Sequence, residues 1–158
     1  MTFCQIICQY ARMRDASHPA AHSSLGALLR DAYEWLSERV YGRLAGQGFP
    51  EIRRAHGGVL RHIRPEGSRL TELAQAAGMA KQSMAYLVED LARLGHVETL
   101  PDPEDGRARR VRLTAKGRGL METMLGLSRE AEAELAAGIG PREAAGLRRA
   151  LEKLAALR

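Results

Sequence analysis

Aromatic residues, cysteines and long hydrophobic runs are all scarce in this chain of 158 residues. Aromatic side chains make up 4% of it, so the core has to rest on Leu, Ala, Val and Met, a set that favours helices. Two cysteines are too few for a disulfide scaffold, which indicates a reducing compartment. The opening MTFCQIICQYARMR lacks the basic start of a signal peptide, and its apolar run is too short to span a membrane. We therefore expect a cytoplasmic protein.

Motifs of catalysis are missing as well. The sequence has no Gly-rich phosphate loop, no Ser-centred nucleophile elbow, no HExxH motif and no carboxylate pair placed for acid–base chemistry. We therefore expect neither an enzyme nor a cofactor.

Four soft ligands near the start, Cys4, Cys8, His18 and His22, have some likeness to a zinc site. Their central spacer of nine residues is shorter than that of a zinc finger, and the hydrophobic framework of a finger is absent. We predict no bound metal. A regulator that senses a metal or thiol oxidation through Cys4 and Cys8 is kept as an alternative.

Basic residues outnumber acidic ones by 24 to 19, which gives a net charge of +5 and a pI of about 9.7. Hydrophobic residues at 45% and charged residues at 27% are globular proportions. Residues 101–118 hold six basic and three acidic side chains, a local excess of +3. This surplus indicates an anionic partner, either nucleic acid or a membrane surface. No helix combines a basic face with aromatic anchors, which argues against the membrane.

Apolar residues at helical spacing predict two helices in the first part of the chain. Residues 1–22 show no clean period and are expected to form a mobile or loosely attached arm. The first helix is predicted from Ser24 to Gly46. The second is predicted to begin at Pro50 and to end before Pro65, with two internal glycines that permit a close helix contact.

Two more helices are predicted at the other end of the chain. Thr114 caps a long helix to about Ala137, and Gly140 with Pro141 starts the last one. Their apolar stripes exceed what a monomer of this size covers, which indicates a subunit interface. The stripes consist of Leu120, Met124, Leu127, Ala131, Leu135, Leu147, Leu151, Leu154 and Leu157.

The middle of the chain predicts a helix-turn-helix. Thr71 is expected to cap a short helix, Gly78 makes a turn, and a longer helix runs over residues 80–94 until Gly95 ends it. Alternating residues at 96–100 and at 110–113 then predict a β-hairpin with an arginine-rich tip.

The stretches LTELAQAAGMAKQSMAYLVEDLARLGHVE and PDPEDGRARRVRLTAKG resemble the helix-turn-helix and the wing of the MarR family of bacterial regulators. The resemblance implies a mainly α fold with a small β-hairpin wing, about six helices, and a homodimer. It also implies a ligand-responsive repressor that binds double-stranded DNA. Four parts follow from it, namely the arm at 1–22, dimerisation and linker helices at 23–66, the winged helix-turn-helix at 67–114 and dimerisation helices at 115–158.

In this family the second helix of the motif lies in the major groove with its first turns facing the bases. Gln82 can bond adenine, Lys81 can reach guanine or phosphate, and the Tyr86 hydroxyl suits a phosphate. Ala80 stands where the family usually has a capping Ser or Thr, so the cap is expected to be weak. The outward residues are Lys81, Gln82, Ser83, Ala85 and Tyr86.

The resemblance places Arg107 at the wing tip, where it would enter a narrow minor groove, and makes Asp105 the carboxylate that orients it. Arg109, Arg110 and Arg112 suit phosphates on the flanks. We expect an anionic partner here because four arginines in six residues repel one another. The alternative is a charged hairpin that keeps an exposed edge soluble.

Many relatives bind a small aromatic or anionic effector between the dimer helices and the DNA-binding lobe. The candidates here are Arg30, Tyr33, Trp35, His56 and His62. Alternatively, the two aromatic residues are core or interface anchors and the histidines are exposed. A protein-interaction module built on a winged-helix scaffold is the other competing function.

Overall fold

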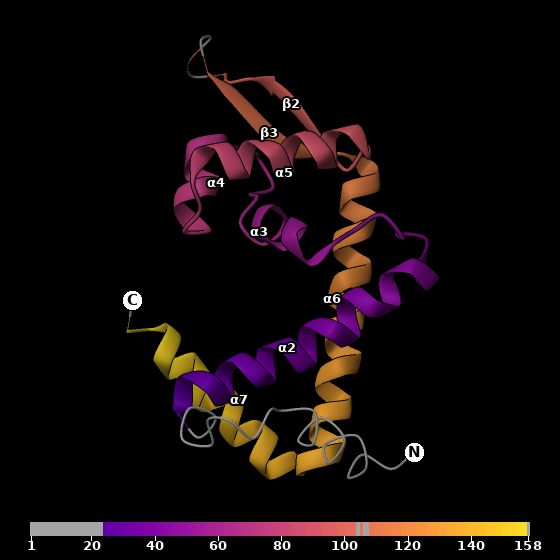
Figure 1. The fold of residues 1–158 in the computed structure, drawn as a ribbon, viewed down its shortest axis with the longest axis vertical. Helices are drawn as coiled ribbons and strands as arrows, with labels where there is room; N and C mark the ends of the chain where they lie inside the picture. Colours follow the sequence, from indigo (N-terminus) through magenta and orange to yellow (C-terminus); the bar gives the residue numbers. More distant parts are fainter. Residues whose placement is uncertain (1–23, 104, 106–107, 158) are drawn as a thin grey trace, which may run out of the picture. The chain divides into compact units, whose positions relative to one another are not determined.

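The computed structural model describes residues 24–103, 105 and 108–157. The chain divides into two compact units (Figure 1). The second unit is Val40–Leu127, and the first is formed by the segments on either side of it, up to Arg39 and from Ser128. The arm predicted at residues 1–22, with Cys4 and Cys8, lies outside the described residues.

Six α-helices and one three-stranded antiparallel sheet make up the described part of the chain, which confirms a mainly α, winged helix-turn-helix fold. The helices are α2 (Leu25–Leu44), α3 (Gly57–Leu60), α4 (Leu70–Ala76), α5 (Lys81–Arg93), α6 (Ala115–Ile139) and α7 (Pro141–Ala155). Short 3-10 helices are η2 (Ala45–Gln47) and η3 (Arg54–His56), and the strands are β1 (Ser68–Arg69), β2 (Val97–Pro101) and β3 (Arg109–Leu113). No described helix is long and apolar enough to cross a membrane.

β3 is the central strand of the sheet. Ser68 of β1 and Thr99 of β2 pair with Val111 from opposite sides. The predicted hairpin is confirmed as β2 and β3, and β1 was missed because two residues are too few to show alternation. Val97 and Val111 face the core while charged residues alternate with them on the other face.

The core of the second unit is aliphatic, as the shortage of aromatic residues predicts. On α5, Met84, Leu87, Val88 and Leu91 are buried, at the spacing of one helix face. They pack with buried residues from the neighbouring helices and the sheet, namely Leu44, Leu60, Leu73, Val97, Val111 and Leu120. Each such side chain stabilises the fold by about 1.5–3 kcal/mol of apolar burial.

The helix predicted from Pro50 is wrong at its start. Pro50 lies in a turn, and the helical part is limited to η3 and to α3. The predicted close contact does occur at Gly57, where an added Cβ would lie 2.5 Å from the Tyr41 hydroxyl. The cap predicted at Thr71 is also wrong. Helix α4 begins at Leu70, and the N-cap is Arg69, whose backbone N–H donates to the Glu72 carboxylate at 3.1 Å.

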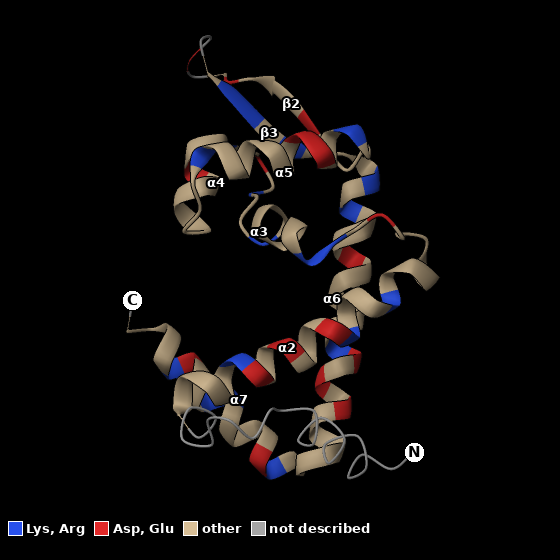
Figure 2. Cartoon of the chain, in the orientation of Figure 1, with Lys and Arg blue, Asp and Glu red and all other residues tan. Residues whose placement is uncertain are grey.

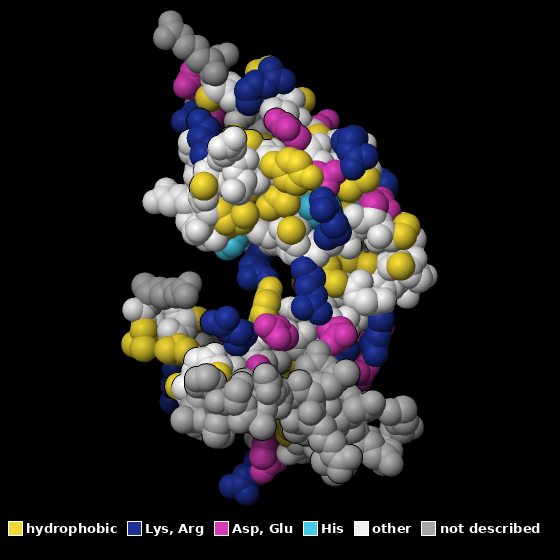
Figure 3. Space-filling view, viewed as in Figure 1, with side chains coloured by type: hydrophobic (Ala, Val, Ile, Leu, Met, Phe, Trp, Pro, Cys, Tyr) yellow, Lys and Arg dark blue, Asp and Glu magenta, His cyan; other side chains and the backbone are white. Residues whose placement is uncertain are grey.

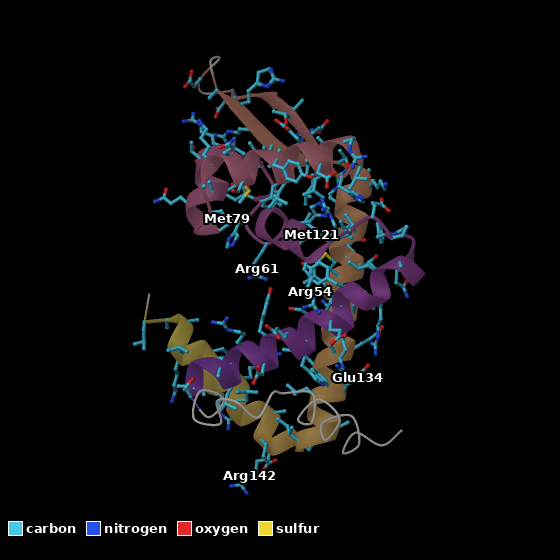
Figure 4. The ribbon with its side chains drawn as sticks, in the orientation of Figure 1. Arg54, Arg61, Met79, Met121, Glu134 and Arg142 are labelled. Carbon is cyan, nitrogen blue, oxygen red and sulfur yellow. The ribbon has the colours of Figure 1, made fainter. Side chains whose placement is uncertain are left out.

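Within the first unit, Arg39 links α2 to α6. Its guanidinium lies 3.4 Å from the centre of the Trp35 ring and donates to Glu134 at 2.9 Å. Glu134 is labelled on α6 in Figure 4. A second ion pair joins Arg148 of α7 to Glu132 of α6. These polar contacts set the helix arrangement within this unit while much of its apolar surface stays exposed.

Candidate nucleic-acid interface

The turn between α4 and α5 sets the direction of α5. Gly78 has φ +62°, a conformation that favours glycine, and it permits the tight turn that the sequence predicts. Ala80 is the N-cap of α5 and makes no side-chain cap hydrogen bond, which confirms the weak cap. The buried face then holds α5 against the core, so its opposite face points to solvent.

The exposed face of α5 carries most of the residues predicted to read DNA. Lys81, Gln82 and Ser83 are exposed, and Ala85 is half-buried. Tyr86 is 62% exposed, which is unusual for a large aromatic residue. Figure 3 shows hydrophobic side chains at the surface over α5 with basic side chains around them. The first two turns therefore offer hydrogen-bonding groups in a row on the surface.

An ion cluster on the flank of α5 was not found from the sequence. The Asp90 carboxylate is 10% exposed and accepts from Arg93 at 2.5 Å, from His56 at 3.0 Å and from Arg53. These hydrogen bonds, those from Arg93 and His56 first, lower the pKa of Asp90 from 3.8 to about 2. Arg53 and Asp90 are 37 residues apart, so no local pattern reports their pairing.

His56 is fully buried at the base of this cluster. Its Nδ1 accepts from the backbone N–H of Arg53 at 3.1 Å, and its Nε2 faces Asp90. Burial lowers the pKa of His56, against the opposing effect of Asp90, so the ring is neutral near pH 7. A neutral ring with Nδ1 as acceptor carries its proton on Nε2 and donates it to Asp90.

The wing arginines that the structure describes are paired inside the protein. The buried Asp102 carboxylate accepts from Arg69 at 2.6 Å and from Arg110 at 3.0 Å. Arg112 pairs with Glu98 at 3.0 Å, and Arg109 donates to a backbone carbonyl of β2 at 3.2 Å. Repulsion among these arginines is therefore offset by the protein itself, which corrects the premise that it requires an anionic partner.

The wing still concentrates basic side chains at one place. In Figure 2, Lys and Arg colour much of β3. Asp105 is exposed, and its backbone carbonyl accepts from the N–H of Ala108 at 2.8 Å. Arg107 lies outside the described residues, so its position at the wing tip and its orientation by Asp105 stay predictions.

Glu51 links the start of the wing to the start of α6. Glu51 accepts from Lys116 at 3.0 Å and faces His96 Nε2 at 3.2 Å. Its pKa falls from 4.5 to about 2, first because of its own backbone N–H and then because of Lys116. His96 precedes β2 and Lys116 lies in the first turn of α6, so this contact fixes both ends of the hairpin.

The five candidate effector residues fall in different units. Arg30, Tyr33 and Trp35 lie on α2 in the first unit, where Tyr33 is exposed and Trp35 is half-buried. His62 is half-buried in the second unit. The alternative that the histidines are exposed is wrong for His56, whose two ring nitrogens are engaged inside the protein. In the described part of the chain, no group of three His, Cys, Asp or Glu residues could hold a metal ion.

Comparison with known proteins agrees with this architecture. The sequence profile of the MarR family matches residues 52–108. Wild-type MarR from E. coli is 26% identical with a TM-score of 0.70, over 83% of this chain and 96% of that one. No curated protein matches the sequence.

Two structures of CouR are also similar. The transcriptional repressor CouR bound to a 23-mer DNA duplex is 22% identical with a TM-score of 0.70, over 90% of this chain and 99% of that one. CouR from Rhodococcus jostii RHA1 bound to p-coumaroyl-CoA is 24% identical with a TM-score of 0.67, over 87% and 95% of the two chains.

The helix-turn-helix with its three-stranded wing defines a DNA-binding transcriptional regulator. Residues 52–108 carry the match to the MarR family of transcriptional regulators, and MarR has the same fold over most of this chain.

Proposed function

We propose that this chain is a ligand-responsive repressor that binds an inverted-repeat operator as a homodimer. The observation that carries the proposal is the exposed polar face of α5 in the same compact unit as the basic strand β3. CouR, a repressor of the same fold, binds a DNA duplex and supports the repressor role.

The α5 face suits the major groove. Gln82 and Ser83 in the first turn can bond base edges, and Lys81 can bond guanine or a phosphate. Ala85 is partly covered and can contact only an apolar group such as a thymine methyl. Tyr86, one turn further, can bond a phosphate through its hydroxyl.

The wing suits the adjacent minor groove. Arg107 is proposed to enter the groove, with Asp105 orienting its guanidinium. Arg109 and Arg112 are exposed and can add phosphate contacts, because exposed ion pairs such as Arg112–Glu98 contribute at most about 1 kcal/mol and exchange easily. Arg110 is half-buried against Asp102, so we propose that it supports the wing as well as facing DNA.

Homodimer formation is proposed from the apolar surface of the first unit. Leucines of α2, of α7 and of the turn after α7 are exposed to an extent that a stable monomer avoids. They are Leu25 at 71%, Leu28 at 53%, Leu151 at 41%, Leu154 at 50% and Leu157 at 82%. A dimer with two-fold symmetry requires an operator whose half-sites are also related by a two-fold axis, with centres about one helical turn apart.

An aromatic or anionic effector is proposed because CouR binds p-coumaroyl-CoA. Arg30 can pair with an anionic group, and Tyr33 or Trp35 can stack on a ring. His62 offers a half-buried imidazole. His56 has no free ring nitrogen, so it can only transmit an effect to Asp90 on α5.

The experiment is an affinity selection of genomic fragments by the purified full-length chain, followed by sequencing. We expect the enriched fragments to share one inverted repeat, and sedimentation to give a dimer. Adding p-coumaroyl-CoA as a probe effector then tests ligand control. Enrichment with no shared repeat contradicts operator recognition, and a monomer at the concentrations that bind DNA contradicts the symmetric complex.

A further inference from the structure

Arg53 precedes the helix-turn-helix in sequence, yet its side chain lies against α5. The residue stands just before η3, and its guanidinium is 56% exposed. It donates to Asp90, and its interactions with Asp90 and then with the Tyr86 hydroxyl raise the pKa of Arg53. Asp90 thus holds an exposed cation next to the exposed tyrosine on which a phosphate contact is predicted.

The charges around this point leave a positive excess. Asp90 is the carboxylate of the cluster, and Arg53 and Arg93 both donate to it. His56 is the remaining titratable partner and is neutral because of its burial. Within this cluster, two guanidinium groups against one carboxylate leave a net charge of +1.

The hydrogen-bonding capacity of the pair is also only partly used. A guanidinium has five N–H donors, and the two contacts of Arg53 leave others directed to solvent. The Tyr86 hydroxyl can accept from Arg53 and still donate its own proton. A phosphate oxygen needs such donors close together, and Arg is well suited to supply them.

We propose that Arg53 and Tyr86 together bind one phosphate of the DNA backbone beside α5, and that Asp90 is the positioning residue for Arg53. The proposal rests on the proposed function, because it assumes that α5 lies in the major groove. It adds a contact from outside the helix-turn-helix and the wing, and it gives the buried Asp90–His56 pair a role in DNA binding.

The first test compares Arg53→Gln with Arg54→Gln. The two residues are adjacent, both exposed, and lose the same charge, but Arg54 points away from α5 (Figure 4). The probes are a duplex carrying the selected repeat and a random duplex of equal length. We expect Arg53→Gln to weaken both complexes about tenfold and to reduce the salt slope by about two, since each subunit of the proposed dimer loses one phosphate contact. Arg54→Gln should match the wild type.

A double-mutant cycle with Tyr86→Phe tests whether the two residues share one phosphate. We expect Tyr86→Phe to weaken binding in the wild-type background and to have little further effect beside Arg53→Gln. If the wild-type chain binds its repeat and the Arg53→Gln and Arg54→Gln variants bind it with equal affinity, the inference is overturned. The proposed function then stays intact. Failure of the wild-type chain to prefer its selected repeat is the separate failure of the proposed function.

Asp90→Asn tests whether Asp90 positions Arg53, because a positioning role and a pure charge effect predict opposite changes in DNA affinity. Removal of a negative charge near DNA should strengthen binding if only net charge mattered. We expect weaker binding to both duplexes, because Arg53 loses its anchor, with circular dichroism confirming a folded variant. Tighter binding would overturn the role of Asp90. The Arg53→Lys variant keeps the positive charge, and we expect it to have the salt slope of the wild type. If the role of Arg53 were purely structural, this substitution would not restore the slope.

Discussion

At Gly117, the first turn of α6 passes so close to the start of β2 that no side chain fits between them. A Cβ on this residue would lie 2.0 Å from the His96 carbonyl oxygen. The Gly117 backbone N–H also donates to the Thr114 hydroxyl at 3.1 Å, which confirms Thr114 as the predicted helix cap. One glycine thus allows the wing and the long helix to meet.

Gly117→Ala is therefore expected to destabilise the protein by about 3 kcal/mol, because the neighbouring group is backbone and cannot rotate away. Gly119→Ala is the matched control. It lies in the same helix with no atom within 4 Å of an added Cβ, and it should stabilise by about 0.5–1 kcal/mol. Urea unfolding of both variants measures the difference, and equal effects would contradict the close contact.

The ionisation of Glu51 predicts a dependence of stability on pH. Its pKa is about 2 in the folded protein against 4.5 in an unfolded chain, so the ionised form favours folding. The contribution is complete above pH 4.5 and is lost as the pH falls toward 2. Glu51→Gln should remove that part of the slope in urea midpoints measured between pH 5 and 2. An exposed control, Glu122→Gln, should retain it, and an unchanged slope in Glu51→Gln would contradict the assignment.

Among the elements, the wing depends on Asp102, a fully buried carboxylate that joins β1 to β3 through Arg69 and Arg110. Asp102→Asn should cost about 2 kcal/mol, because two charge-assisted hydrogen bonds weaken in a buried setting. Glu98→Gln breaks only the exposed pair with Arg112 and should cost less than about 1 kcal/mol. Thermal unfolding distinguishes the two, and equal costs would show that Asp102 is not the anchor.

The wing tip is predicted to bind DNA through Arg107. Arg107→Ala should weaken operator binding at least about tenfold, equal to about 1.4 kcal/mol, while the protein stays folded. Arg142→Ala removes the same charge from an exposed position at the start of α7 and serves as the control. An anisotropy titration in which both variants bind like the wild type would remove the wing from the interface.

Among the helices and strands, sequence patterns predict the structure correctly where it depends on residues that are close in sequence. The apolar period of α5 and the alternation of β2 and β3 follow from burial of one face, and the structure confirms them. The helix expected from Pro50 fails at its start, where Pro50 lies in a turn, and helical pairing is confined to η3 and α3. Of the two glycines after η3, Gly57 makes the close contact with Tyr41. The strand β1 exists only through its pairing with β3, which no local pattern reports.

Contacts between distant residues account for what the sequence could not predict about the site. The outward residues of α5 were identified from periodicity together with the family resemblance. The cluster of Arg53, His56 and Asp90 was not, because charged residues on a helix are ordinarily solvated and their spacing carries no signal. For the same reason, the sequence does not show that Arg110 is compensated by Asp102, a pairing that the structure provides.

In the whole molecule, the two units are expected to have different roles. The second unit holds the surface that is proposed to bind DNA, and the first unit holds the exposed leucines from which a dimer is proposed. The dependence of DNA affinity on salt is expected to come from the second unit, because each phosphate that it neutralises releases counterions. The symmetry of the operator is expected to follow from the dimer proposed for the first unit.

The most direct measurement is a titration of the full-length chain against a labelled duplex carrying the selected repeat, at several salt concentrations, with unlabelled random duplex as competitor. We expect binding at least about a thousandfold tighter than to random DNA, with affinity that falls steeply as salt rises. Equal affinity for the selected and the random duplex, or an affinity that does not change with salt, would contradict sequence-specific recognition by α5 and the wing.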